Sequence, residues 1–163
     1  MATTLNIGEA DIYTEVRAFL RGLFSCEIIR GYSNNVPLPQ APFVLMNILG
    51  TADAATNEHA YDKAAGTAGV GRATTVRMQL DFYGAGAEER CRIFTHLWRD
   101  FYACEHLQQC QPLYTDDARF MPLSNEEADF EERWTVTAYL AYCPTVTHGQ
   151  EYVRTFEIEL TQL

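Results

Sequence analysis

Hydrophobic and polar residues alternate from Thr74 to Tyr83, which is the clearest strand pattern in the chain. Val76, Met78, Leu80 and Phe82 fall on one side of an extended backbone, and polar residues fall on the other. After the turn 83–86 the period changes to three and four, which is typical of an amphipathic helix. Its apolar positions are Cys91, Phe94, Leu97, Trp98, Phe101 and Tyr102. A helix joined to the strand by so short a turn is expected to cover the strand's apolar face.

The first 50 residues predict one helix and two extended segments. Acidic residues at Glu9 and Asp11 open a helix with an apolar stripe that ends near Phe24. A short extended piece follows at 27–30. The run 43–49 is almost wholly apolar, so we expect a strand buried on both faces that pairs with the strand 74–83.

The last third of the chain predicts two more strands. Glu131 to Tyr142 alternates between apolar and polar residues. Pro144 to Gln150 is expected to make a turn, and Tyr152 to Leu163 to form the final strand. The order helix, strand, strand, helix, strand, strand favours one α+β domain spanning 1–163. We expect a mainly antiparallel sheet of about four strands with both helices packed on one face.

Two segments lack a sustained period. The segment 50–73 is rich in Ala, Gly and Thr, and we interpret it as a long hairpin loop that becomes ordered against another surface. A floppy surface loop is the equally weighted alternative. The segment 111–123 is bounded by prolines and predicts an irregular structure, but it is too apolar for a linker.

Composition excludes several classes of function. The net charge of -10 argues against wrapping nucleic acid, because binding of that kind requires cations against phosphates. We found no run long enough to span a membrane and no export signal, so we expect a soluble protein made in the cytoplasm. Five cysteines in such a chain predict reduced, mostly buried thiols.

Candidate chemistry is weak throughout. Cys104, His106 and Cys110 are close in sequence but lack the second pair of ligands that zinc sites use. Cys91 and His96 are five residues apart, which does not place them on one helix face as a nucleophile and its base. The acidic run 125–132 lacks the glycine turn of a calcium loop. We therefore assign no catalytic, cofactor-binding or metal-binding residue and expect no enzyme.

Polar residues and tyrosines outside the predicted core suggest a role in assembly instead. Tyrosines are common at protein interfaces because they combine apolar area with a polar tip. Arginines beside acids on strand faces suggest ion pairs across strands or between subunits. The candidate subunit-interface residues are Arg77, Gln79, Asp81, Tyr83, Tyr114, Asp116, Asp117, Arg119, Arg133 and Tyr139.

Several short motifs, in a fixed order from about Val16 to the C-terminus, resemble those of phage neck or tail-terminator proteins. They are Tyr32 to Pro39, Pro42 to Met46, Gln79 to Gly84, Trp98 to Tyr102, Pro112 to Asp117, Glu132 to Thr135 and Pro144 to Thr147. The chain departs from the family pattern at Ala141-Tyr142-Cys143-Pro144, where a Gln-Tyr-Asn-Pro run would be expected.

The resemblance implies a non-enzymatic virion protein that forms a ring, typically a hexamer, at the head-proximal end of a phage tail. Such a ring ends the tail tube and joins it to the head-tail connector or adaptor, and the tail sheath is a further candidate partner. DNA would pass through the lumen without sequence-specific binding, and acidic walls would repel its phosphates. Two alternatives stay open: another neck component, namely an adaptor or tail-tube subunit, or a small phage-encoded hydrolase.

Overall fold

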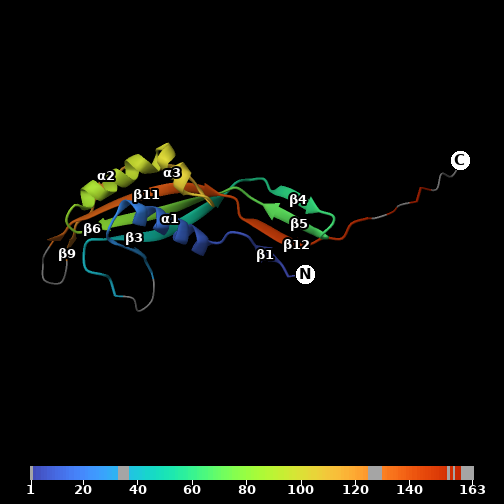
Figure 1. Cartoon of the computed structure of the whole chain (residues 1–163), viewed down its shortest axis with the longest axis horizontal. Helices are drawn as coiled ribbons and strands as arrows, with labels where there is room; N and C mark the ends of the chain where they lie inside the picture. Colours follow the sequence, from blue (N-terminus) through green and yellow to red (C-terminus); the bar gives the residue numbers. More distant parts are fainter. Residues whose placement is uncertain (1, 33–36, 125–129, 154, 156, 159–163) are drawn as a thin grey trace.

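The chain folds into an α+β structure, as the sequence predicts, in which helices cover one face of a mainly antiparallel sheet (Figure 1). A computed structural model describes residues 2–32, 37–124, 130–153, 155, 157 and 158. The molecule has two parts, which we call the body and the arm. The body contains a six-stranded sheet and the helices, and the arm is a four-stranded sheet that projects from one end of the body (Figure 1).

The body sheet is built around the two alternating strands. Its order is β2-β3-β6-β11-β7. The short strand β8 also pairs with β11, at residues of β11 that β7 does not reach. β3 and β6 pair antiparallel, as do β6 and β11, whereas β2 runs parallel to β3. The bounds are β2 Glu27–Arg30, β3 Phe43–Asp53, β6 Thr74–Tyr83, β7 Gln111–Thr115, β8 Arg119–Phe120 and β11 Arg133–Tyr142. A separate two-stranded pair is formed by β9 (Leu123–Ser124) and β10 (Phe130–Glu131).

The helices are α1 (Glu9–Leu23), α2 (Ala87–Trp98) and α3 (Phe101–His106). Aromatic rings join them to the sheet and to each other: Phe94 of α2 lies 6.0 Å from Phe82 of β6, and Phe19 of α1 lies 5.8 Å from Trp98 (ring centroids). These residues belong to one continuous buried cluster. The predicted cover of the strand's apolar face by the helix is therefore confirmed.

The predicted second helix is interrupted after Trp98. The side chain of Asp100 accepts a hydrogen bond from the backbone N–H of Tyr102 at 2.9 Å and so caps the start of α3. The restart shifts the helical phase, and Phe101 is exposed although the spacing placed it on the buried stripe. The prediction for Phe101 is wrong for this reason.

The arm consists of β1 (Thr4–Leu5), β12 (Thr145–Gly149), β5 (Thr67–Gly71) and β4 (Glu58–Asp62), in that order across the sheet. The segment 50–73 thus contains a hairpin, and β5 also pairs with β12. Where the sequence predicts a turn at 144–150, the structure has a strand. Five residues are too few for a clear period, and pairing with β5 decides their conformation.

Two further expectations differ from the structure. The segment 111–123 contains β7 and β8, whose backbone conformation is set by hydrogen bonds to β11. The final strand predicted at 152–163 is not present in its described residues, which carry no regular element, and the rest of that segment lies outside the described residues. The acidic residues 125–129 also lie outside them.

Candidate assembly surface

The predicted interface residues gather on one region of the molecule, the face of the body sheet that is turned away from the helices. We call it the outer face. Side chains directly opposite each other on paired strands share a face. The register pairs Arg77 with Tyr139 and Tyr83 with Arg133, and on the other edge of β11 it pairs Tyr139 with Tyr114. Residues from a stretch of 63 positions, Arg77 to Tyr139, therefore meet on one surface.

Asp81 is the centre of a polar network on this face. Only 1% of its surface is exposed. One carboxylate oxygen accepts hydrogen bonds from Arg133 Nη2 at 2.9 Å and Nε at 3.2 Å, and the other accepts one from Gln79 Nε2 at 2.8 Å. A buried carboxylate needs such partners to offset its desolvation. Asp81 therefore fixes the positions of Arg133 and Gln79.

Tyr83 is also buried, at the edge of the same network. Its ring stacks on Phe43 with centroids 4.5 Å apart, and the Arg133 guanidinium lies 5.4 Å from its centroid. Burial raises the pKa of the Tyr83 hydroxyl, and the nearby Arg133 lowers it by a smaller amount. Asp81 and Tyr83 are buried within the subunit and hold the neighbouring side chains of the outer face in position.

The exposed part of the outer face is aromatic and charged. Tyr114 is 51% exposed and stacks on Tyr139 with ring centroids 4.3 Å apart. Arg77 and Arg119 are exposed on the same side of the sheet, and Asp117 is exposed as well. A stacked pair of tyrosines between charged groups is typical of the composition of protein interfaces.

A cleft of about 170 Å³ lies beside the tyrosine pair. Its lining includes Gln79, Asp116, Asp117, Arg119 and Arg133, five of the ten predicted residues. Asp116 is held in place because its carboxylate accepts the backbone N–H of Thr137 at 2.6 Å.

Thr135 also lines this cleft. Its buried hydroxyl has no hydrogen-bond partner among the described residues. An unsatisfied buried hydroxyl is costly, so Thr135 is a polar group of this cleft whose hydrogen bonding the subunit does not complete.

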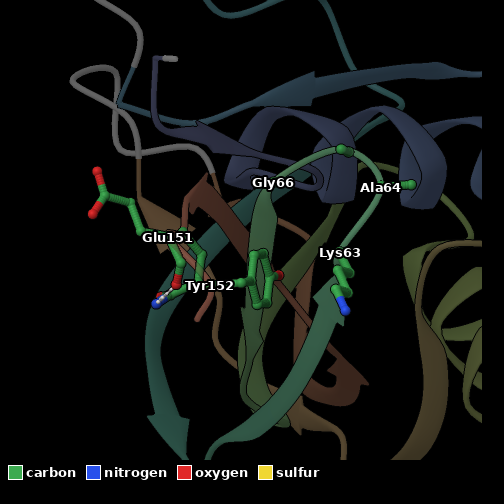
Figure 2. A pocket seen from close by; sticks show the side chains of 7 residues that line it. Lys63, Ala64, Gly66, Glu151 and Tyr152 are labelled. Atoms are coloured by element: carbon green, nitrogen blue, oxygen red, sulfur yellow. Dashed lines mark hydrogen bonds between the residues drawn. The ribbon is translucent and has the colours of Figure 1, made fainter. Parts of the chain in front are cut away.

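A hollow of about 810 Å³ lies at the tip of the arm (Figure 2). Lys63, Ala64 and Gly66 of the β4–β5 turn form one side, and Glu151 and Tyr152 form the other. Hydrogen bonds within the arm account for much of its polar lining. Tyr152 Oη donates to the carbonyl of Thr67 at 2.6 Å, and Gln150 N–H donates to the carbonyl of Gly66 at 2.9 Å. These hydrogen bonds attach the start of the C-terminal segment to the arm.

The cysteine, histidine and carboxylate side chains of the described residues are dispersed over the structure. No group of three or more metal-binding side chains comes together among them. Cys91 is in the core, where burial raises the pKa of its thiol to about 12, whereas His96 is exposed on the same helix. A thiol with so high a pKa is a poor nucleophile at neutral pH. In the described part of the chain, no helix has the length and hydropathy needed to cross a bilayer.

Two contributors to this surface were missed from sequence. Phe43 was assigned only to a buried strand, and its stacking on Tyr83 depends on the β3–β6 register. Thr135 was placed on the correct strand face, but no pattern indicates that its hydroxyl lacks a partner.

Comparison with known proteins gives a match over nearly the whole chain. The profile of a family described as "Phage neck terminator protein" matches residues 10–163. No curated protein sequence matches the chain. Among solved structures, a chain from "Virion of native gene transfer agent (GTA) particle" aligns with a TM-score of 0.35 and 15% identity. That alignment covers 82% of this chain and 91% of the other.

Proposed function

We propose, because the chain belongs to the phage neck terminator protein family, that copies of it form a ring at the head-proximal end of a phage tail. Members of this family are structural, non-enzymatic components of the virion, and so is this chain. In our proposal the ring is a hexamer that ends the tail tube and joins it to the head-tail connector or adaptor. The match over residues 10–163 is the observation that carries the proposal.

The distribution of surface features supports association between copies. The arm projects from the body, and the outer face presents the stacked pair Tyr114 and Tyr139 with a polar cleft beside it. These are different surfaces of one chain. Contacts between two different surfaces of identical subunits are heterologous, and they generate a ring when the rotation between subunits closes. We assign the segments 50–73 and 111–123 to contacts with neighbouring copies or with the tail tube.

The charge of the chain supports passage of DNA through such a ring. With 22 acidic and 12 basic residues, six copies would carry a large negative charge. An acidic wall repels phosphates, so DNA can move through the lumen without adhering.

Particles produced without this protein test the position of the ring. In our proposal, tails lacking it grow beyond their normal length, and electron microscopy of the mutant lysate should find these long tails separate from filled heads. Restoring the gene should restore the normal length. Filled heads without any tails would instead indicate an adaptor, and an absence of tail tubes would indicate a tube subunit.

Native mass spectrometry tests the ring itself. The purified protein should give a hexamer. It should also give a hexamer after it has been added to tails that were produced in its absence. A closed assembly of another size would contradict the stoichiometry, and a strictly monomeric protein on completed tails would contradict the ring.

A further inference from the structure

One face of the arm is the more apolar, and its aliphatic residues are aligned across β1, β12 and β5, with His148 of β12 on the same face. Leu5 of β1 lies opposite Val146 of β12, Val146 lies opposite Val70 of β5, and Val70 lies opposite His59 of β4. The register also places Tyr61 opposite Ala68 on this same face. The opposite face carries mainly threonine and glycine from β5 and β12. The arm is therefore amphipathic, like a sheet that packs on a second layer.

In the described structure, part of this apolar face has no second layer over it. Leu5 is 54% exposed, and Val146 is exposed as well. Together with Val70, Tyr142 and Pro144 they form the apolar side of a groove of about 400 Å³ where the arm leaves the body. Its other side is polar and is lined by Thr51, Asp53, Asn57, Arg72 and Thr74. The helices of the body do not extend over the arm (Figure 1). Large side chains left in water on one sheet face favour binding of an apolar partner.

The C-terminal segment of the chain has the matching pattern. Val153 is 81% exposed and Ile158 is 73% exposed. In sequence, Phe156, Ile158 and Leu160 alternate with Glu157 and Glu159. In an extended backbone this places three apolar side chains on one side and two carboxylates on the other. Such a segment can bury its apolar side in a groove while its carboxylates remain in water.

We propose that the C-terminal segment 153–163 of one copy occupies the apolar groove of the arm of a neighbouring copy. The inference rests on the proposed ring, since it requires copies to be neighbours. It identifies a specific contact between them, in which Phe156, Ile158 and Leu160 cover Leu5, Val70 and Val146.

The starting point of the segment favours a neighbour's groove over its own. Tyr152 is tied to the tip of the arm by its hydrogen bond to Thr67. Beyond Tyr152 the described residues lead away from both the arm and the body (Figure 1). Eleven residues follow Tyr152. Extended, they reach about 35 Å, enough to cross to an adjacent subunit.

Crosslinking between differently marked copies tests the contact. The background chain carries Cys26→Ser, Cys104→Ser and Cys143→Ser, which leaves only the buried Cys91 and Cys110. One copy then receives Ile158→Cys, and the other, isotopically labelled, receives Val146→Cys. After mixing, a short bis-maleimide should link them into a dimer of mixed isotope content, both in concentrated purified protein and in assembled particles.

Two matched controls move a thiol to the opposite side of each partner. Glu157→Cys replaces Ile158→Cys on the segment, and Thr147→Cys replaces Val146→Cys on the arm. Each control should lose the mixed dimer. Equal yields from the controls would overturn the proposed contact, as would the absence of a link in the principal pair.

The remaining outcomes distinguish the occupants of the groove and separate this inference from the ring. A chain carrying both Ile158→Cys and Val146→Cys, diluted among background copies, should not link to itself, and an internal link would place the segment in its own groove. A link from Val146→Cys to a different virion protein would also overturn the inference. Hexamers without the mixed dimer would contradict the contact and leave the ring intact. Mixed dimers without closed rings would support the contact and contradict the ring.

Discussion

Arg133 and Asp81 form a nearly buried ion pair between β11 and β6, and the two guanidinium hydrogen bonds end on the same carboxylate oxygen. The other carboxylate oxygen is bound by Gln79. This pair is part of the subunit's own structure and sets the shape of the outer face, where Arg133 also lines the polar cleft.

Replacing Asp81 by Asn should destabilise the subunit, because it leaves the largely buried Arg133 without a countercharge. The free energy of unfolding should fall by about 3 kcal/mol, the lower end of the effect of breaking a buried pair. Urea unfolding measures this directly. The control is Glu88→Gln, which breaks the exposed pair with Arg92 and should cost about 0.5 kcal/mol or less. Equal effects of the two changes would contradict the structural role of Asp81.

Replacing Tyr114 by Ala should impair assembly more than folding. Tyr114 is half exposed, and its stack on Tyr139 contributes about 1 kcal/mol to the subunit. We expect a modest loss in the urea experiment and loss of the ring in native mass spectra. Phe101→Ala provides a matched control, since Phe101 is an exposed aromatic residue on a helix and away from the outer face. Normal ring formation by the Tyr114→Ala variant would contradict the assignment of Tyr114 to the interface.

Removing the β4–β5 hairpin should leave a folded body. The N–H of Ala54 donates to the carbonyl of Ala73 at 2.8 Å, so the two chain ends meet at the base of the hairpin. Residues 55–72 can therefore be replaced by Asn-Gly, which makes a tight turn between β3 and β6. We expect a cooperative unfolding transition and no attachment to tails. In the control, serines replace Ala64 and Ala65 at the arm tip, and attachment should persist. Normal attachment without the hairpin would contradict its assignment to assembly.

The stability contributed by Cys91 should decrease in alkaline solution. Its thiol has a pKa of about 12 in the folded chain, raised by burial from an ordinary value of 9.0. Between these values the unfolded chain loses the proton and the folded chain keeps it, so stability falls as pH rises. This contribution changes by about 1.4 kcal/mol per pH unit.

The destabilisation caused by Cys91→Ala should therefore be constant below about pH 9 and shrink above it. Urea unfolding at pH 8, 9.5 and 10.5 gives the comparison. Cys143→Ser is the control for loss of a thiol outside the core, because Cys143 is exposed. A constant effect of Cys91→Ala across this range would contradict the prediction.

Local pattern was sufficient for the long elements of the fold. Alternation over ten residues identified β6 and β11, and a helical stripe identified α1, because their apolar faces repeat often enough to define a period. The polar side of the same alternation placed Arg77, Asp81 and Tyr139 on one face. The family resemblance, distributed along the chain, was confirmed by the match over residues 10–163.

Short elements depended on partners far away in sequence. β12 has only five residues, Thr145–Gly149. It is a strand because β5 and β1 both pair with it. β7 contains Pro112, which cannot donate to a sheet, and it pairs at the edge with β11. Neither segment has enough local pattern to specify a strand.

The sequence by itself determined which residues lie on each face of the long strands, since the direction of side chains follows directly from the strand period. Only the tertiary structure decided which polar residues are accessible. In the folded chain, Asp81 is buried against Arg133, and Tyr114 stacks on Tyr139 while remaining exposed. Leu5, Val146 and Val70 are aligned across the arm. These relationships join residues from distant parts of the chain, and they depend on strand pairing and register, which local periodicity does not contain.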